Sequence, residues 1–317
     1  MMAHGTPISG ACQFDRRVPP GGYAWWYVDA ISDDSEFAIT LIAFIGSVFS
    51  PYYAWAGRAD PLNHCALNVA LYGRRGRCWA MTERGRDKVL ATSATLQIGP
   101  SRLAWDADGL TVDVAETGMP MPFPIRGRVR LAPRSLNATS FHIDRAGAHY
   151  WQPISPVADV EVDFDQPGVR WRGRGYFDMN FGDSPLEQAF RYWDWSRIHL
   201  RDGVTAITYN TDERNGDQNR LALRFGRDGE CEALPAHAPL DLAPTRIFRI
   251  RRRTSPLGDD LVRLGSTLED TPFYSRSIIQ TALGGERGFG VHESFDGNRL
   301  QSALVKLMLP FRMPRLA

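Results

Sequence analysis

The sequence places two acidic side chains in an unusually aromatic stretch, GRGYFDMNFGDSPL, at residues 173–186. Asp178 stands between Phe177 and Met179, and Asp183 directly precedes Ser184 and Pro185. A carboxyl group in apolar surroundings loses hydration, which raises its pKa and can keep it protonated near neutral pH. We therefore interpret Asp178 as a candidate proton donor. Asp183 is better explained as an acid at the start of a helix, where the helix dipole favours negative charge.

Three pairs of residues near this acid have the i, i+2 spacing that puts both side chains on the same face of a β-strand. The pairs are His149 with Trp151, Tyr176 with Asp178, and Trp193 with Trp195. On neighbouring strands they would form one surface with an acid, a proton partner and several aromatic rings. For the first pair, an ordinary aromatic core with a hydrogen-bonded histidine is an equally good explanation.

Aromatic residues are concentrated around these pairs. Twelve lie between Phe141 and Trp195, about double the 11% of the whole chain. This density predicts an aromatic-lined cavity. The residues that we expect to bind substrate there are Trp193, Trp195, Phe177 and Phe181.

Other kinds of site are not indicated. The sequence has no GxSxG nucleophile motif and no phosphate-binding GxxxxGK[ST] loop. The histidines lack metal-site spacing, so we expect no metal. The net charge of +1 argues against nucleic acid as a partner.

The elements that must position these residues are mostly strands. Short alternating runs recur along the chain, several of them joined by Asp-Gly turns such as Asp108-Gly109. The pattern predicts a mainly β protein of two antiparallel barrels or sandwiches, at residues 1–155 and 156–317, with a few short helices. The most apolar run, Phe37 to Phe49, is too short for a membrane-spanning helix and is expected to be a buried strand.

Helices are predicted at three places. Ser184 to Glu187 combines a capping box with a proline at the first helical position. Residues 271–283 and 297–309 are the other two. The four cysteines show neither paired nor metal-binding spacing, and the N-terminus lacks a signal-peptide pattern, so a cytosolic location with free thiols is expected.

Five segments together resemble one protein family. They are GGYAWWYVDAISDD, FIGSVFSPYYAWA, RGYFDMNFGDSPLE, YWDWSR and LPFRMPR, spread from Gly21 to about Arg315. The chain resembles the bacterial carotenoid 1,2-hydratases, the hydroxyneurosporene synthase family. This resemblance implies two lipocalin-like β-domains, a hydro-lyase without a cofactor, and an acyclic carotenoid substrate such as neurosporene or lycopene. It also implies that Asp178 is the essential acid, with His149, Trp151 and Tyr176 at supporting positions.

The implied reaction adds water to the terminal C1–C2 double bond and gives a 1-hydroxy carotenoid. An isolated alkene is a very weak base, so a strong acid must protonate carbon 2 and leave the positive charge on the tertiary carbon 1. Aromatic faces such as those of Trp151 and Tyr176 can stabilise that cation by ~2 kcal/mol or more when desolvated. His149 is expected either to orient Asp178 or to position the water.

A polyene substrate must be drawn from a bilayer. We therefore expect peripheral association with the cytoplasmic side of the inner or intracytoplasmic membrane. Lys306, Arg312 and Arg315 lie among apolar residues in a segment without acids, and the RIRRR run at 249–253 adds further basic charge. A packed final helix and an ordinary solvated strand end explain these features equally well.

Two other functions stay open at this point. A non-catalytic isoprenoid or lipid carrier would release its ligand with unaltered mass. A related cyclase would give an isomer, whereas hydration adds the mass of one water. The sequence leaves the oligomeric state open.

Overall fold

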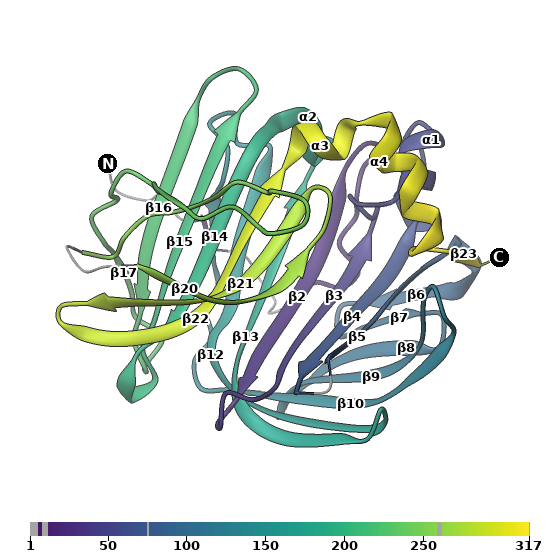
Figure 1. Cartoon of the computed structure of the whole chain (residues 1–317). Helices are drawn as coiled ribbons and strands as arrows, with labels where there is room; N and C mark the ends of the chain where they lie inside the picture. Colours follow the sequence, from purple (N-terminus) through teal and green to yellow (C-terminus); the bar gives the residue numbers. More distant parts are fainter. Residues whose placement is uncertain (1–5, 8–11, 75, 259–261, 317) are drawn as a thin grey trace. The chain divides into compact units, whose positions relative to one another are not determined.

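The protein is described by a computed structural model, which covers residues 6–7, 12–74, 76–258 and 262–316 (Figure 1). Most of these residues lie in strands, which confirms the predicted mainly β class. The described chain forms two compact units. The first unit comprises Thr6–Ser140, Trp151–Pro185 and residues 306–316; the second comprises Phe141–Tyr150 and Leu186–Val305.

This division differs from the expected one at residue 155. The chain leaves the first unit after Ser140, returns at Trp151, leaves again after Pro185 and returns after Val305. Two of these crossings occur inside continuous strands: the one between Ser140 and Phe141 lies in β11 (Thr139–His142), and the one between Tyr150 and Trp151 lies in β12 (His149–Gln166). No flexible linker is needed there, which is why composition did not reveal the crossings.

The first unit supplies most of a large antiparallel sheet, in which backbone hydrogen bonds join 14 strands of the described chain. Their main order is β23-β5-β4-β3-β2-β13-β12-β10-β9-β8-β7-β6, with β1 and β11 at the side. The strands are β1 (Thr6–Pro7), β2 (Tyr23–Ser32), β3 (Ala38–Ile45), β4 (Cys65–Gly73), β5 (Gly76–Arg84), β6 (Val89–Thr92), β7 (Thr95–Ile98), β8 (Ser101–Asp106), β9 (Gly109–Gly118), β10 (Phe123–Pro133), β11 (Thr139–His142), β12 (His149–Gln166), β13 (Val169–Gly182) and β23 (Arg315–Leu316).

This sheet curls, so that β6 to β10 run across the direction of β2 to β5 (Figure 1). Every residue of β3 is buried, which confirms a buried strand within the apolar run from Phe37 to Phe49. The Asp108-Gly109 turn joins β8 to β9 as predicted. Phe177 on β13 stacks on Trp105 of β8, with ring centroids 5.8 Å apart, although three strands separate β13 from β8. The curl therefore brings the inner faces of distant strands together.

One glycine permits a close approach within this sheet. A β-carbon added at Gly127 would lie 2.4 Å from the Phe164 ring and 2.5 Å from the Asp163 carbonyl oxygen. The pairing of β10 with β12 shifts register at this position. Glycine thus lets the two strands stay in contact through the irregularity.

The second unit contains a seven-stranded antiparallel sheet in its described residues, in the order β17-β16-β15-β14-β22-β21-β20. A two-stranded ribbon, β18-β19, packs near β14 and β22. The strands are β14 (Phe190–His199), β15 (Thr205–Glu213), β16 (Gln218–Phe225), β17 (Cys231–Ala233), β18 (Leu240–Leu242), β19 (Arg252–Thr254), β20 (Arg263–Asp270), β21 (Tyr274–Leu283) and β22 (Glu286–Asp296).

The helices are short. The predicted starts near Ser184 and Gly297 are confirmed, because helices follow at both places. The helix predicted at residues 271–283 is wrong: Tyr274–Leu283 form β21, which pairs with β22 over its whole length. The helical elements are α1 (Pro51–Trp55), α2 (Leu186–Ala189), α3 (Gly297–Gln301) and α4 (Ala303–Met308), with 3-10 turns η1 (Pro61–Asn63), η2 (Arg86–Lys88), η3 (Arg201–Gly203) and η4 (Leu309–Phe311). None of the helices in the described part of the chain combines the length and apolar character needed to cross a bilayer.

Candidate active site

Two adjacent strands of the first unit position the predicted acid. β13 pairs antiparallel with β2, so that Tyr176 lies opposite Asp29 and Asp178 lies opposite Tyr27. Residues directly opposite each other project from the same face of a sheet, as do residues two apart on one strand. These four side chains therefore share one face, which confirms the common face predicted for Tyr176 and Asp178.

The carboxyl group of Asp178 is buried and held by neutral donors. Only 4% of the residue is exposed. Its Oδ2 accepts hydrogen bonds from the Trp151 indole N–H and the Tyr176 hydroxyl, both at 2.8 Å. The Trp151 nitrogen also lies 3.1 Å from the Tyr176 hydroxyl oxygen. Strand β12 thus contributes the third member of a closed triangle of polar groups.

This triangle determines which oxygen can carry a proton. Because both donors point at Oδ2, that oxygen is an acceptor, and a proton bound by this carboxyl would belong on Oδ1. Burial raises the pKa of the Tyr176 phenol well above its ordinary value, and the neighbouring Asp178 raises it further. Tyr176 is therefore a neutral donor near neutral pH. The arrangement presents an acid in a fixed orientation beside two aromatic rings.

A second tyrosine–aspartate pair was missed by the sequence analysis. On β2 the Tyr27 hydroxyl donates to Asp29 Oδ2 at 2.9 Å, and Asp29 is fully buried. The rings of Tyr27 and Tyr176 approach within 6.1 Å at an interplanar angle of 65°. The signal that could have revealed this pair is the repeated spacing YVD at 27–29 and YFD at 176–178.

His149 is the first residue of β12 and belongs to the second unit. It is buried, its backbone N–H donates to Asp144 Oδ1 at 2.8 Å, and its ring meets Phe190 edge-on at 4.9 Å. These contacts fix the ring between the turn that precedes β12 and the start of β14. Its expected role toward Asp178 or water stays a prediction.

Trp193 and Trp195 lie side by side on one face of β14, as their spacing predicts. Trp193 stacks on Phe295 with ring centroids 5.5 Å apart and also contacts Tyr209. Trp195 is buried and lies opposite Tyr209 on β15. They form an aromatic cluster of the second unit, and their contact with substrate stays a prediction.

Phe177 and Phe181 occupy the other face of β13 from Tyr176 and Asp178. Strand alternation dictates this, and their contacts agree with it: Phe177 stacks on Trp105, and the Arg16 guanidinium lies 3.5 Å above the Phe181 ring. The two phenylalanines therefore do not line the surface that carries Asp178. Among the described residues, no group of three or more His, Cys, Asp or Glu side chains is placed to hold a metal ion.

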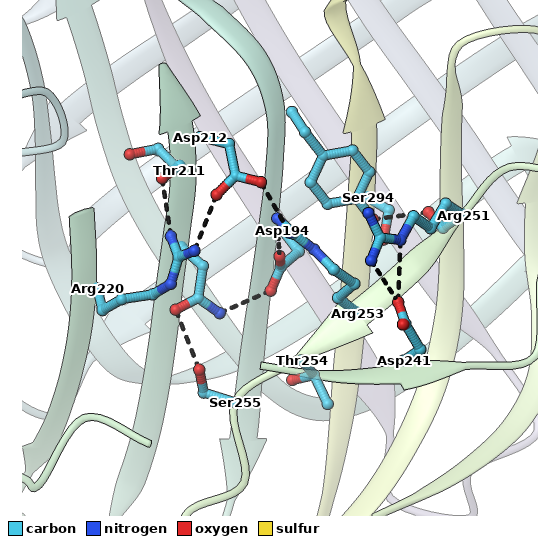
Figure 2. Close-up of polar contacts among 12 residues, drawn as sticks. Asp194, Thr211, Asp212, Arg220, Asp241, Arg251, Arg253, Thr254, Ser255 and Ser294 are labelled. Carbon is cyan, nitrogen blue, oxygen red and sulfur yellow. Dashed lines mark hydrogen bonds and ion pairs between the residues drawn. The ribbon is translucent and has the colours of Figure 1, made fainter. Parts of the chain in front are cut away.

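A second buried polar cluster lies in the second unit (Figure 2). Asp194 on β14 accepts a hydrogen bond from the Asn210 amide at 2.7 Å, and Arg253 on β19 lies 3.5 Å from its carboxylate. Arg253 also contacts Asp212 at 2.7 Å, and Arg220 pairs with the same carboxylate at 2.8 Å. This chain of alternating charges joins the β18-β19 ribbon to the sheet. The RIRRR run is therefore not a free basic surface, because Arg252 and Arg253 are buried.

The pKa of Asp194 in this cluster predicts a pH effect on stability. Burial raises it from 3.8 to about 7, so between these values the folded protein keeps a proton that the unfolded chain loses. The free energy of unfolding should fall as pH rises from about 4 to about 7, by up to about 4 kcal/mol from this group. In Asp194→Asn this contribution should vanish. Urea titrations of both proteins at pH 5 and pH 7.5 measure it.

His292 changes the free energy of unfolding with pH in the opposite direction, and it is present in both proteins. Burial lowers its pKa to about 3, which costs stability as pH falls below about 6.5 in both proteins. The difference between wild type and Asp194→Asn therefore isolates the carboxyl. An equal pH dependence in the two proteins would show that Asp194 is ionised in the folded state throughout this range.

The fold and the site together define a lipocalin-like β protein with a buried, hydrogen-bonded acid among aromatic rings. The family model for the carotenoid hydratase CrtC matches residues 41–317. The acyclic carotenoid 1,2-hydratase of Thiocapsa roseopersicina is 51% identical over 96% of this chain and 76% of its own length. That of Rubrivivax gelatinosus is 49% identical over 97% of this chain and 77% of its own length. The chain belongs to the carotenoid hydratase family.

Solved structures share the fold at low sequence identity. A protein described as AttH from Nitrosomonas europaea superposes with a TM-score of 0.56 at 13% identity, over 86% of this chain and 92% of its own. The crystal structure of CghA gives a TM-score of 0.52 at 13% identity, over 93% of each chain. At this identity the likeness concerns the fold alone.

Proposed function

We propose that the protein hydrates the terminal C1–C2 double bond of an acyclic carotenoid by acid catalysis without a cofactor. The observation that carries this proposal is the buried Asp178 carboxyl, whose Oδ2 is occupied by the Trp151 N–H and the Tyr176 hydroxyl. Family membership and the activity named for the relatives in Thiocapsa and Rubrivivax support the substrate class.

The geometry supports the following steps. The proton on Asp178 Oδ1 passes to carbon 2 of the alkene, and the positive charge develops on the tertiary carbon 1. The two hydrogen bonds to Oδ2 strengthen as Asp178 becomes anionic, because bonds to a charged acceptor are stronger. The rings of Trp151 and Tyr176 supply neutral π-density near the cation without a nucleophile that could trap it. Water then adds to carbon 1 and loses a proton.

The test is incubation of the purified protein with lycopene in liposomes and mass analysis of the products. We expect a gain of the mass of one water at a terminal group. An unaltered mass would favour the carrier, and an isomer of unchanged mass would favour the cyclase. Activity that persists after exhaustive treatment with chelator and gel filtration would support independence from a cofactor.

The end of the chain supports a membrane-docking surface, defined here as Leu307, Met308 and Phe311. Phe311 is 74% exposed, and the other two side chains are also exposed. Two of the basic residues expected to contact lipid make contacts within the protein. Arg315 is paired with Glu83, and the Arg312 guanidinium lies 4.5 Å above the Trp79 ring. Membrane contact at the cytoplasmic face would therefore depend on apolar insertion more than on charge.

We expect Leu307→Ser/Phe311→Ser to weaken binding to liposomes by at least tenfold, because each apolar side chain contributes about 1.5 kcal/mol or more when it leaves water. Flotation with anionic and neutral vesicles at low and high salt measures this. The matched control is Leu90→Ser/Met121→Ser, which removes two equally exposed apolar side chains from the same unit. Equal flotation of the two double variants would exclude this surface.

A further inference from the structure

The candidate site contains two copies of one arrangement. On β13 the Tyr176 hydroxyl donates to Asp178, and on β2 the Tyr27 hydroxyl donates to Asp29. Because the strands are antiparallel, each aspartate lies directly opposite the tyrosine of the other pair. The two acids are thus related by a local two-fold arrangement on a single sheet face. The proposed hydration uses only one of them.

The expected spacing of the two aspartates suits a two-acid reaction. Asp29 and Asp178 are diagonal neighbours across the β2–β13 pair, and the strand positions of such neighbours lie about 7 Å apart. Inverting glycosidases, in which one carboxyl donates a proton while the other activates a water, hold their carboxyls roughly 6.5–9.5 Å apart, which leaves room for the water. Asp29 lies directly opposite Tyr176, which is one member of the triangle around Asp178.

The chemistry of hydration requires a group in this position. After carbon 2 has been protonated, a water oxygen forms a bond with carbon 1 and becomes an oxonium ion that must lose a proton. In the reverse direction the hydroxyl group leaves only if a proton is donated to it. A carboxyl group can act as base in one direction and as acid in the other.

We propose that Asp29 is the proton acceptor for the attacking water, an assignment that rests on the proposed hydratase function. The O–H bond of Asp178 breaks and its proton forms the new C–H bond at carbon 2. Water forms the C–O bond at carbon 1, and its surplus proton passes to the Asp29 carboxylate. The proton then returns from Asp29 to Asp178, so that alkene and water are consumed and alcohol is the sole product. Tyr27 orients Asp29 as Tyr176 orients Asp178.

The two acids can be separated by following the oxygen atom of the product. Incubation of the 1-hydroxy carotenoid with enzyme in oxygen-18 water exchanges the hydroxyl oxygen whenever the C–O bond breaks and re-forms. That exchange needs a proton at the oxygen, from Asp29, and none at carbon 2. We expect Asp29→Asn to lose exchange and hydration together by about 10²- to 10⁴-fold. Asp178→Asn should lose hydration to the same degree and retain measurable exchange.

Further variants distinguish chemistry from structure. Asp29→Glu keeps a carboxyl group, so its rate of oxygen exchange should exceed that of Asp29→Asn. If the role of Asp29 were purely structural, the two variants would exchange oxygen at the same rate. If Asp29→Asn does not fold, Tyr27→Phe decides, because it keeps Asp29 and removes the hydroxyl that orients it. We then expect a several-fold fall in the maximal exchange rate at unchanged KM.

The outcomes separate the two proposals. Wild-type exchange rates in folded Asp29→Asn, or in Tyr27→Phe if that variant has to decide, would overturn the assignment of Asp29 and leave the hydratase function standing. Wild-type hydration without any oxygen exchange would also overturn it. A wild-type protein that neither hydrates lycopene nor exchanges the alcohol oxygen would remove the proposed function itself.

Discussion

Asp178→Asn should abolish the hydration of acyclic carotenes in liposomes, with a fall of about 10²- to 10⁴-fold in rate. The amide is nearly isosteric with the carboxyl group, and its oxygen can still accept from the Trp151 N–H and the Tyr176 hydroxyl. The fold should therefore survive, while the proton that the alkene needs is gone. Product mass and the initial rate of alcohol formation measure the effect.

The matched control is Asp183→Asn, five residues along the same segment. Asp183 is exposed and precedes α2 by three residues. We expect hydration within about twofold of the wild type, because surface substitutions of this kind change stability by little. Full activity in Asp178→Asn would remove this acid from the mechanism, whatever the control shows.

Arg253→Ala should lower the free energy of unfolding by about 3 kcal/mol or more. Its guanidinium is buried between the carboxylates of Asp194 and Asp212 and lies 4.3 Å from the Tyr192 ring centroid. Removal of the guanidinium leaves Asp194 without its cationic partner and Asp212 with Arg220 alone, and the loss of one partner of a buried ion pair is costly. Urea denaturation followed by tryptophan fluorescence measures the change.

Arg251→Ala provides the comparison within the same segment. Arg251 pairs with Asp241 at 2.9 Å, but both side chains are mostly exposed, so the pair should contribute less than about 1 kcal/mol. Figure 2 shows Arg251 paired with Asp241, and Arg253 close to Asp194 and Asp212. Similar losses in both variants would mean that the ribbon depends on general packing and not on the buried charge chain.

The local parts of the site could be predicted from sequence. Strand alternation alone placed Tyr176 and Asp178 on one face, and the repeated turn signals indicated a mainly β fold. The same rule excludes Phe177 and Phe181 from that face. They were predicted to bind substrate because aromatic residues are dense in this segment, and that density does not distinguish the two faces of a strand.

The long-range parts could not be predicted. The pairing of β2 with β13 joins residues about 150 positions apart, and no local signal specifies it. Without that pairing Asp29 has no reason to lie beside Tyr176. Residues 271–283 were expected to form a helix because a short apolar run fits the periodicity of a helix as well as that of a strand. Pairing with β22 selects the strand. The alternation of the chain between the two units could not be read from composition for a related reason, since two crossings lie within the strands β11 and β12.

The two residues of β23 carry a consequence for how the molecule is made. They align in parallel with β5 at Glu83 and Arg84, and Arg315 is paired with Glu83 there. During synthesis on the ribosome, β5 emerges more than two hundred residues before this partner. The unit that bears both aspartates must therefore wait, with one sheet edge uncovered, until these two residues have been synthesised.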